Sequence, residues 1–386
     1  MDDAPAITTV NALVAQAILS AASDVHLEPT VYGLRIRFRR DGFLFDSGSV
    51  LDEYALSVIA RIKVLARLDI GEKRVPQDGK FTIAGHVGNI DVRVATFPCL
   101  YGEKIVIRIL DRARTILSLQ DLGFSVPMLH AIEQLMQRAQ GFFIVTGPTG
   151  SGKTTTLYSL LNFLCCFKRN IVTLEDPVEY TITGTTQAQV RPDIGFTFAQ
   201  GIRAVLRQDP DIIMVGEMRD VETAQVAVQA ALTGHLVLST LHTTDTLNSI
   251  VRLRDMGIAP FLINATVTGI LAQRLVRVLC AVCKERRTLT AQEQAQAQAL
   301  GLDIHDAFFA TGCSACCNSG YQGRIGVFEL LLATPQLRAA IAQGASYDEL
   351  YTIACAQGMQ PLMYDAAHKV MAGISSFSEL LRVVVQ

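Results

Sequence analysis

The sequence predicts an α/β domain built on a parallel sheet, with a smaller α+β domain before it and a cysteine-bearing module with short helices after it. From about residue 127, a helix, a strand, a glycine-rich loop, a second helix and a second strand follow one another, which is the pattern of a parallel sheet. Before residue 110, strand pairs alternate with helices, which is typical of an α+β domain. From residue 280, close pairs of cysteines mark the third part.

Composition places the chain among globular proteins. Its 386 residues are enough for about two or three domains, half of them are apolar, and the net charge is only −2. Because no basic block is present, we expect no binding to nucleic acid. The acidic start is no secretory signal, and the uncharged run from Met256 to Gln273 contains Gly257 and Pro260, so it predicts a buried segment rather than a membrane span. The expectation is a cytosolic protein.

The amino-terminal domain is expected to cover residues 1–110. Residues 10–23 place apolar side chains on one helical face, namely Val10, Leu13, Val14, Ala17 and Ile18. Residues 34–45 alternate apolar side chains with arginines, and Asp41-Gly42 supplies a hairpin turn between two strands. A helix over residues 57–68 and two strands over 88–97 and 103–110 follow. The arginine stripe Arg35, Arg37 and Arg39 is expected to form a solvated strand face.

Four apolar runs, each followed by a polar loop, predict the strands of the parallel sheet. They are residues 141–147, 170–176, 211–217 and 234–242. Weak periodicity indicates a linker over residues 111–126, so the core is expected at 127–279. The cysteine module would cover 280–330, with an Ala/Gln-rich helix inside it, and a helical region would cover 331–386.

A phosphate-binding loop is predicted at Gly147–Thr154, where "GPTGSGKT" follows a strand and opens a helix. Glycines allow backbone N–H groups to turn toward phosphate oxygens, and the helix N-terminus favours negative charge. Lys153 is expected to reach the β- and γ-phosphates, and the Thr154 hydroxyl to ligate Mg²⁺. The residues expected to bind the nucleotide are Gly147, Pro148, Thr149, Gly150, Ser151, Gly152, Lys153, Thr154 and Thr155.

Two later strands end in acids that can serve this loop. Glu175 and Asp176 end "LEDPVEY", and Glu217 ends "DIIMVGE", where Gly216 occupies the place at which an aspartate would usually close the run. The carboxyl ends of parallel strands share one edge, so these carboxylates can hold Mg²⁺ or orient the attacking water. His242, after the strand of residues 234–242, is a candidate sensor of the γ-phosphate, and His235, before it, a supporting residue.

Two Cys-x-x-Cys pairs, Cys280 with Cys283 and Cys313 with Cys316, predict a structural Zn²⁺ site. Cys317 could compete as a ligand, but Cys313 and Cys316 keep the two-residue spacing. Arginines are a further candidate group, because NTPases that work as rings use a neighbouring subunit's arginine to stabilise transferring charge. The candidates are Arg93, Arg108, Arg203 and Arg207.

An ordered set of motifs resembles the secretion ATPases of type II secretion and type IV pilus assembly. The matching segments are "ASDVHLEP", "RVPQDGKF", "GPTGSGKTTTLYSLL", "TLEDPVEY", "LRQDPDIIMVGEMRDVETAQ", "TGHLVLSTLHTTD" and "ILAQRLVRVLCAVCK". The resemblance covers nearly the whole chain from about Val10. The two cysteine pairs are similar to the secretion and pilus-assembly branch rather than the retraction branch, and "GILAQRLVRVLC" resembles the type II secretion members.

The resemblance implies a small PAS-like amino domain, a RecA-like ATPase core and a homo-hexameric ring with ATP bound between the two lobes. It implies that Glu175 activates water and that Glu217 lies near Mg²⁺. It places His235 and His242 in the family's histidine box. It also implies that Arg93 and Arg108 approach the nucleotide and that Arg203 and Arg207 lie near subunit contacts. Longer members carry an additional amino-terminal docking domain, so this sequence is expected to be either a shortened form or a short natural member.

The expected function is hydrolysis of ATP that powers type II secretion by pseudopilus assembly, through inner-membrane platform proteins. The cofactors would be ATP, Mg²⁺ and Zn²⁺, and the protein would be cytoplasmic and peripheral to the inner membrane. The alternatives are a type IV pilus extension or competence pseudopilus ATPase and, from other classes, a nucleic-acid motor, a small-molecule kinase or a zinc-stabilised interaction module. Near-neutral charge disfavours the motor. The intact phosphate loop disfavours the interaction module.

Overall fold

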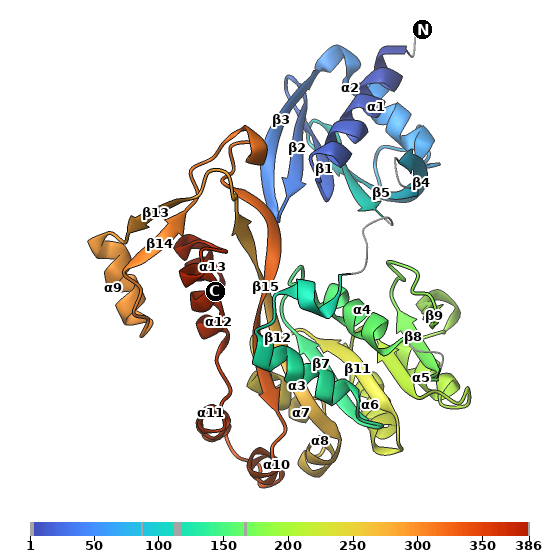
Figure 1. Cartoon of the computed structure of the whole chain (residues 1–386). Coiled ribbons are helices and arrows are strands. Elements are labelled where there is room, and N and C mark those ends of the chain that lie inside the picture. The colour runs from blue at the N-terminus through green and yellow to red at the C-terminus, as the bar shows by residue number, and fades with distance from the viewer. Residues whose placement is uncertain (1–3, 86–87, 112–116, 166–167, 385–386) are drawn as a thin grey trace. The chain divides into compact units, whose positions relative to one another are not determined.

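The computed structural model describes residues 4–85, 88–111, 117–165 and 168–384 (Figure 1). The chain divides into two compact units, Met1–Thr115 and Ile116–Gln386. Part of the expected linker, residues 112–116, lies outside the described residues. The rest of it belongs to the second unit, because Leu119 and Leu122 are buried in that unit's core.

The first unit is a six-stranded antiparallel sheet with the strand order β3-β2-β1-β6-β5-β4. Helices α1 and α2 pack on one face and share a single apolar core with the sheet. Its elements are α1 (Ala4–Leu19), β1 (Asp24–Thr30), β2 (Gly33–Arg40), β3 (Phe43–Leu51), α2 (Asp52–Leu65), β4 (Gln77–Gly85), β5 (Gly88–Cys99) and β6 (Gly102–Asp111).

Most of the expected local structure of this unit is confirmed. The apolar face of α1 is buried in the core, and β2 and β3 form a hairpin whose turn residues, Asp41 and Gly42, both have positive φ. The arginines of β2 face away from the core and pair with acids, as Arg35 does with Asp46 at 2.5 Å. Strands β1 and β4 were not predicted, although β1 lies between β2 and β6 in the sheet.

The second unit contains a seven-stranded mixed sheet with the order β15-β12-β7-β11-β10-β8-β9, and a separate two-stranded sheet, β13-β14. Its helices are η1 (Leu119–Leu122), α3 (Val126–Met136), α4 (Lys153–Leu164), η2 (Pro192–Ile194), α5 (Phe198–Val205), α6 (Val221–Leu232), α7 (Thr246–Asp255), α8 (Pro260–Thr266), α9 (Ala291–Ala299), η3 (Ser314–Cys316), α10 (Pro335–Ala342), α11 (Tyr347–Ala356), α12 (Leu362–Met371) and α13 (Phe377–Val384). Its strands are β7 (Gly141–Thr146), β8 (Ile171–Glu175), β9 (Thr186–Gln189), β10 (Ile212–Val215), β11 (Leu236–Leu241), β12 (Val267–Leu279), β13 (Glu285–Thr288), β14 (Asp306–Phe309) and β15 (Tyr321–Leu332).

The parallel sheet predicted from four apolar runs is confirmed as β7, β8, β10 and β11. These strands are buried along their whole length and mostly apolar, because helices cover both faces of the sheet. In β7, Phe142 and Ile144 pack into the cluster on one face, whereas Phe143 and Val145 pack into the cluster on the other. The phosphate loop therefore leaves a strand that is fixed from both sides.

Strand β15 is the main departure from the predicted organisation. Sequence assigned residues 280–330 to the cysteine module, but Tyr321–Leu332 returns to the core sheet and pairs antiparallel with β12. Strand β12 is itself parallel to β7, so it lies between the return strand and the strand that leads into the phosphate loop. The uncharged run from Met256 to Gln273 forms α8 and the start of β12. No helix within the described ranges is long and apolar enough to cross a membrane.

The carboxyl-terminal helix α13 is held to β12 by a buried carboxylate. Glu379 is 1% exposed and accepts hydrogen bonds from the backbone N–H (2.8 Å) and the guanidinium Nη2 (2.8 Å) of Arg277. Arg382 donates to the same carboxylate at 2.7 Å. Burial disfavours ionisation, but the hydrogen bonds from Arg382 and Arg277 outweigh it and lower the pKa of Glu379.

We expect Glu379→Gln to lower the free energy of unfolding by about 3–5 kcal/mol at neutral pH, because it leaves two buried or half-buried guanidinium groups without their counter-charge. The pKa is lowered on folding, so the contribution is complete above the unfolded value of about 4.3 and is lost as pH falls through the folded pKa. Thermal unfolding of both proteins at pH 7 and near pH 3 measures this. Asp306→Asn at an exposed pair is the control and should change little. Equal unfolding temperatures at pH 7 would contradict it.

Candidate active site and metal centre

The phosphate loop, Gly147–Thr154, joins the carboxyl end of β7 to the amino end of α4. Three of its glycines have positive φ: 148° at Gly147, 79° at Gly150 and 89° at Gly152. A Cβ at Gly147 would lie 2.4 Å from the Gln273 carbonyl oxygen of β12, and one at Gly152 would lie 2.8 Å from the Gln273 side-chain nitrogen. Only glycine fits at these two positions, so β12 shapes the loop.

The loop has the properties of an anion site. It opens α4, a helix of 12 residues whose first N–H groups lack partners within the helix. The hydroxyl of Ser151 is buried, and it has no hydrogen-bond partner within the described ranges. A buried hydroxyl without a partner is costly, and a phosphate oxygen would satisfy it. The loop therefore fits the phosphates of a nucleotide.

Lys153 lies under the loop, and its ammonium donates to the carbonyl oxygens of Gly147 (2.8 Å) and Pro148 (3.0 Å). Burial lowers the pKa of Lys153 to about 8, Glu217 opposes this shift and Arg274 adds to it. The side chains of Thr154 and Thr155 are exposed at the start of α4. The structure thus brings together the lysine, the two threonines and Glu217 at one edge of the sheet.

Glu217 lies just beyond β10, and its carboxylate contacts Arg219 (2.6 Å) and the imidazole Nε2 of His242 (3.4 Å). Gly216 precedes it at a close approach of two strands, since its N–H donates to the Leu174 carbonyl at 2.8 Å. A Cβ at Gly216 would meet that carbonyl oxygen at 3.3 Å, which leaves little space for an aspartate. The geometry explains why the acid follows one residue later.

Glu175, at the end of β8, is 3% exposed and is held by three donors. Tyr158 of α4 makes a short hydrogen bond to it, Thr173 donates at 2.5 Å and Gln187 of β9 at 3.0 Å. Burial and the bond to Glu175 raise the pKa of Tyr158, so its hydroxyl stays protonated and acts as the donor. The carboxylate is thereby fixed within its own unit.

The two histidines lie at opposite edges of the sheet. His242 follows β11 at the phosphate-loop edge and contacts Glu217. His235 precedes β11, where its Nδ1 lies 2.9 Å from the Ala230 carbonyl oxygen at the end of α6. The structure supports a local structural contact for His235 and does not bring it to the phosphate loop.

The four predicted arginines are dispersed. Arg93 and Arg108 belong to the first unit, face each other across β5 and β6, and Arg108 pairs with Asp24 at 2.9 Å. Arg203 pairs with Glu222 of α6 at 2.7 Å, and Arg207 donates to the Arg203 carbonyl. None of these bonds involves a residue of the phosphate loop.

Sequence reasoning missed four polar residues of this region, namely Tyr158, Arg219, Gln273 and Arg274. Tyr158 carried a signal, because a tyrosine on the buried face of a helix needs a partner for its hydroxyl. Gln273 is buried, and its side-chain oxygen accepts a hydrogen bond from Thr156 at 2.7 Å. Gln273 and Arg274 carried no local signal, because only the pairing of β12 with β7 brings them to the loop.

The predicted tetracysteine cluster is present. The sulfur atoms of Cys280, Cys283, Cys313 and Cys316 all lie within 4.8 Å of one another. Three of the sulfur pairs are 3.8–3.9 Å apart. Four sulfurs bound to Zn²⁺ at about 2.3 Å lie about 3.8 Å from each other, so the donor set fits a closed tetrahedral site.

Backbone donors also favour the thiolate of Cys316 in this cluster. The N–H groups of Cys313 (3.2 Å) and Gly320 (3.1 Å) point at the sulfur of Cys316. Burial disfavours the thiolate of Cys316, but these backbone hydrogen bonds outweigh it and lower the pKa of its thiol to about 6. Cys317, the possible competitor, is exposed and is not part of the cluster.

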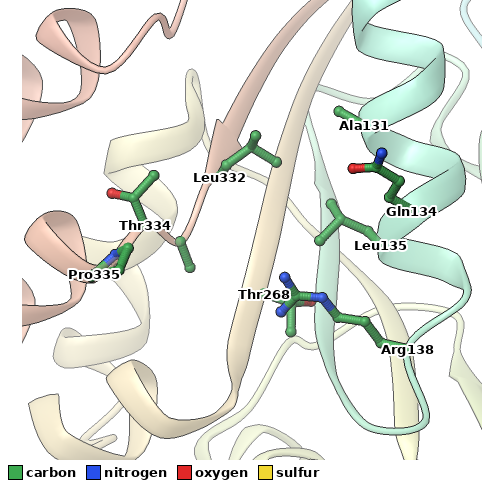
Figure 2. Close-up of a pocket in the computed structure, with 9 residues that line it drawn as sticks. Ala131, Gln134, Leu135, Arg138, Thr268, Leu332, Thr334 and Pro335 are labelled. Atoms are coloured by element: carbon green, nitrogen blue, oxygen red, sulfur yellow. The ribbon is translucent and has the colours of Figure 1, made fainter.

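A separate pocket of about 260 Å³ lies between α3, β12, β15 and the start of α10 (Figure 2). Apolar side chains such as Leu135 and Leu332 line it, together with the exposed guanidinium of Arg138. None of its lining residues belongs to the phosphate loop. It therefore plays no part in the site described above.

A parallel sheet, a glycine-rich loop that opens a helix and two strand-end acids define a phosphate-loop nucleotide-binding protein. Comparison with known proteins agrees with this class. The family described as "Type II/IV secretion system protein" matches residues 1–382. The chain belongs to this family.

Relatives and solved structures agree. "Type II secretion system protein E" of Dickeya dadantii is 48% identical over 385 residues, which cover 99% of this chain and 76% of the relative. "Type II secretion system ATPase E" of Vibrio cholerae is 46% identical over 384 residues, again 99% and 76%. The ATPase DotB of Legionella pneumophila has a similar fold, with a TM-score of 0.71 at 22% identity over 98% of this chain and 95% of its own. The pilus retraction motor PilT has a TM-score of 0.64 at 24% identity, covering 97% and 96%.

We expect the purified protein to contain about one Zn²⁺ per chain, because four converging thiols match its preferred geometry. Cys280→Ser or Cys313→Ser should remove most of the metal and lower the unfolding temperature, as should a strong chelator. Elemental analysis and thermal unfolding measure both effects. Cys99→Ser, at an exposed cysteine outside the cluster, is the matched control. Wild-type protein without metal after expression in zinc-supplemented medium would contradict the prediction.

Proposed function

We propose that this chain hydrolyses ATP and that the reaction powers type II protein secretion. One observation carries the proposal: the phosphate loop, with its buried lysine and unsatisfied Ser151 hydroxyl, lies at the same sheet edge as Glu217 and Glu175. Family membership supports it, and the relative from Vibrio cholerae carries the name of a type II secretion system ATPase.

The residues divide the work as follows in this proposal. Backbone N–H groups of the phosphate loop and the ammonium of Lys153 bind the β- and γ-phosphates. Thr154 and Glu217 hold Mg²⁺, which neutralises phosphate charge when it is bound. Glu175 orients the attacking water, and Tyr158, Thr173 and Gln187 fix its carboxylate beforehand. His242 contacts the carboxylate of Glu217, the proposed Mg²⁺ ligand, through its Nε2.

The finer features of the proposal come from the family resemblance. The protein works as a homo-hexamer in the cytoplasm and contacts the inner membrane only through platform proteins of the secretion machinery. The first unit is PAS-like, which its antiparallel sheet with helices on one face supports. Arg93 and Arg108 approach the nucleotide, Arg203 and Arg207 lie near subunit contacts, and the tetracysteine cluster holds Zn²⁺.

Lys153→Ala tests the proposed activity. We expect ATP hydrolysis to fall by about 10²–10³-fold, because the variant removes the cation that stabilises the transferring phosphate. Phosphate release from purified full-length protein without any added acceptor measures the rate and also separates an ATPase from a kinase. Unchanged turnover in a folded Lys153→Ala protein would refute the assignment.

Substitution of Glu175 and of Glu217 should impair ATP hydrolysis in different ways. Glu175→Gln is expected to retain ATP binding while kcat falls by about 10²–10⁴-fold, because only the water-orienting group is lost. Glu217→Gln should in addition raise the Mg²⁺ concentration needed for half-maximal activity, because it removes a metal ligand. Nucleotide binding and Mg²⁺ titrations of the rate distinguish the variants. The opposite result would be a Glu175→Gln variant that turns over normally but needs more Mg²⁺. Glu175 would then be the metal ligand, and Glu217 would orient the water.

A further inference from the structure

Arg274 of β12 lies directly beside the phosphate loop. Its Nη1 lies 3.2 Å from the point at which a Cβ of Gly147 would be placed. The same guanidinium donates from Nη1 to the Gln273 carbonyl (3.0 Å) and from Nη2 to the Thr244 carbonyl (2.7 Å). These two carbonyls belong to β12 and to the loop after β11, so the guanidinium is clamped where these segments meet the phosphate loop.

In the part of the chain that the structure describes, the charge of Arg274 has no carboxylate in ion-pair contact. The acceptors of its two hydrogen bonds are both neutral backbone carbonyls. Asp245 and Glu329 act on its charge without ion-pair contact, and both accept hydrogen bonds elsewhere, Asp245 from Asn248 and Glu329 from Thr246. Arg219, in contrast, is neutralised by Glu217 at 2.6 Å.

A half-buried guanidinium without a counter-ion is costly unless an anion joins it. With two N–H groups used by the carbonyls, three of its five donors stay available. Arginine also matches phosphate oxygens better than lysine does, because its planar fork can donate two parallel hydrogen bonds. The position next to Gly147 and Lys153 supplies such an anion whenever a nucleotide is bound.

We propose that Arg274 is a second phosphate-binding cation of this site, contributed by the same subunit as the phosphate loop. The proposal rests on the proposed ATPase function and extends it. Lys153 and Arg274 approach the phosphates from two sides, and both belong to the second unit. Arg274 therefore contributes to nucleotide binding in the isolated subunit, without an arginine from a neighbour.

The test measures binding of a fluorescent, non-hydrolysable ATP analogue with Mg²⁺ to the full-length chain, diluted until light scattering shows single subunits. We expect Arg274→Gln to raise Kd by about tenfold or more, because a charged hydrogen-bond donor to phosphate is lost. Arg274→Lys should recover part of this affinity, because it restores the charge without the planar fork. Arg138→Gln is the control and should leave Kd unchanged. It removes an exposed arginine that lines the separate pocket, which contains no residue of the phosphate loop. KM should rise with Kd while kcat changes by less than about threefold.

Other outcomes overturn the proposal. If Arg274 only braced the chain, Arg274→Gln and Arg274→Lys would be equally impaired, with lower kcat and an unchanged Kd. Should Arg274→Gln fail to fold, Arg274→Met and Arg274→Lys provide the comparison, and equal Kd for these two would refute a charge contribution. A wild-type chain that neither binds the analogue nor releases phosphate would refute the ATPase function itself. If the wild-type chain binds the analogue and the Arg274 variants have the same Kd, only the role of Arg274 is refuted.

Discussion

The site depends on how closely strand β12 approaches the phosphate loop. The carbonyl oxygen of Gln273 occupies the space that a Cβ of Gly147 would need, and its side-chain amide does the same at Gly152. The same amide accepts a hydrogen bond from Thr156, one turn into α4. One buried residue of β12 therefore sets the path of the loop at both ends and fixes the first turn of the helix. Replacing either glycine would push β12 away from the phosphate loop that follows its neighbour in the sheet, β7.

A second close approach affects where the acid of β10 lies. Strands β8 and β10 draw together at Gly216, where a side chain would press on the Leu174 carbonyl. The acid of β10 is thereby displaced to Glu217, in the loop that Thr240 holds from β11 through the Gly216 carbonyl (2.8 Å). Glu217 is left partly exposed beside Lys153 and His242, whereas Glu175 is enclosed by its three donors. The two carboxylates thus differ in freedom, which fits a metal ligand and a fixed water-orienting group.

Sequence alone predicted the features that depend on local sequence patterns. The phosphate loop, the four apolar strands, the hairpin at Asp41-Gly42 and the tetracysteine cluster each depend on residues that are near one another in the chain or on a fixed spacing. Sequence could not predict contacts that arise from strand order. Gln273 and Arg274 lie more than 100 residues beyond the loop they contact. Strand β15 was not separated from the cysteine module, because its partner in the core sheet, β12, precedes that module in the chain. Gln187 was missed for the same reason, since it reaches Glu175 only through the pairing of β8 with β9.

Strand β12 also connects the two chemical centres of the second unit. It passes Gln273 and Arg274 at the phosphate loop, is fixed to α13 at Arg277, and ends one residue before the first metal-site cysteine, Cys280. A strand rises about 3.3 Å per residue, so about 20 Å of hydrogen-bonded backbone separates Arg274 from Cys280. Pairing with β15 stiffens this segment, and the tetracysteine cluster closes the connection between the two strands at its far end. The tetracysteine cluster therefore lies at the far end of a strand pair that is braced along its length, on the same strand that shapes the phosphate loop.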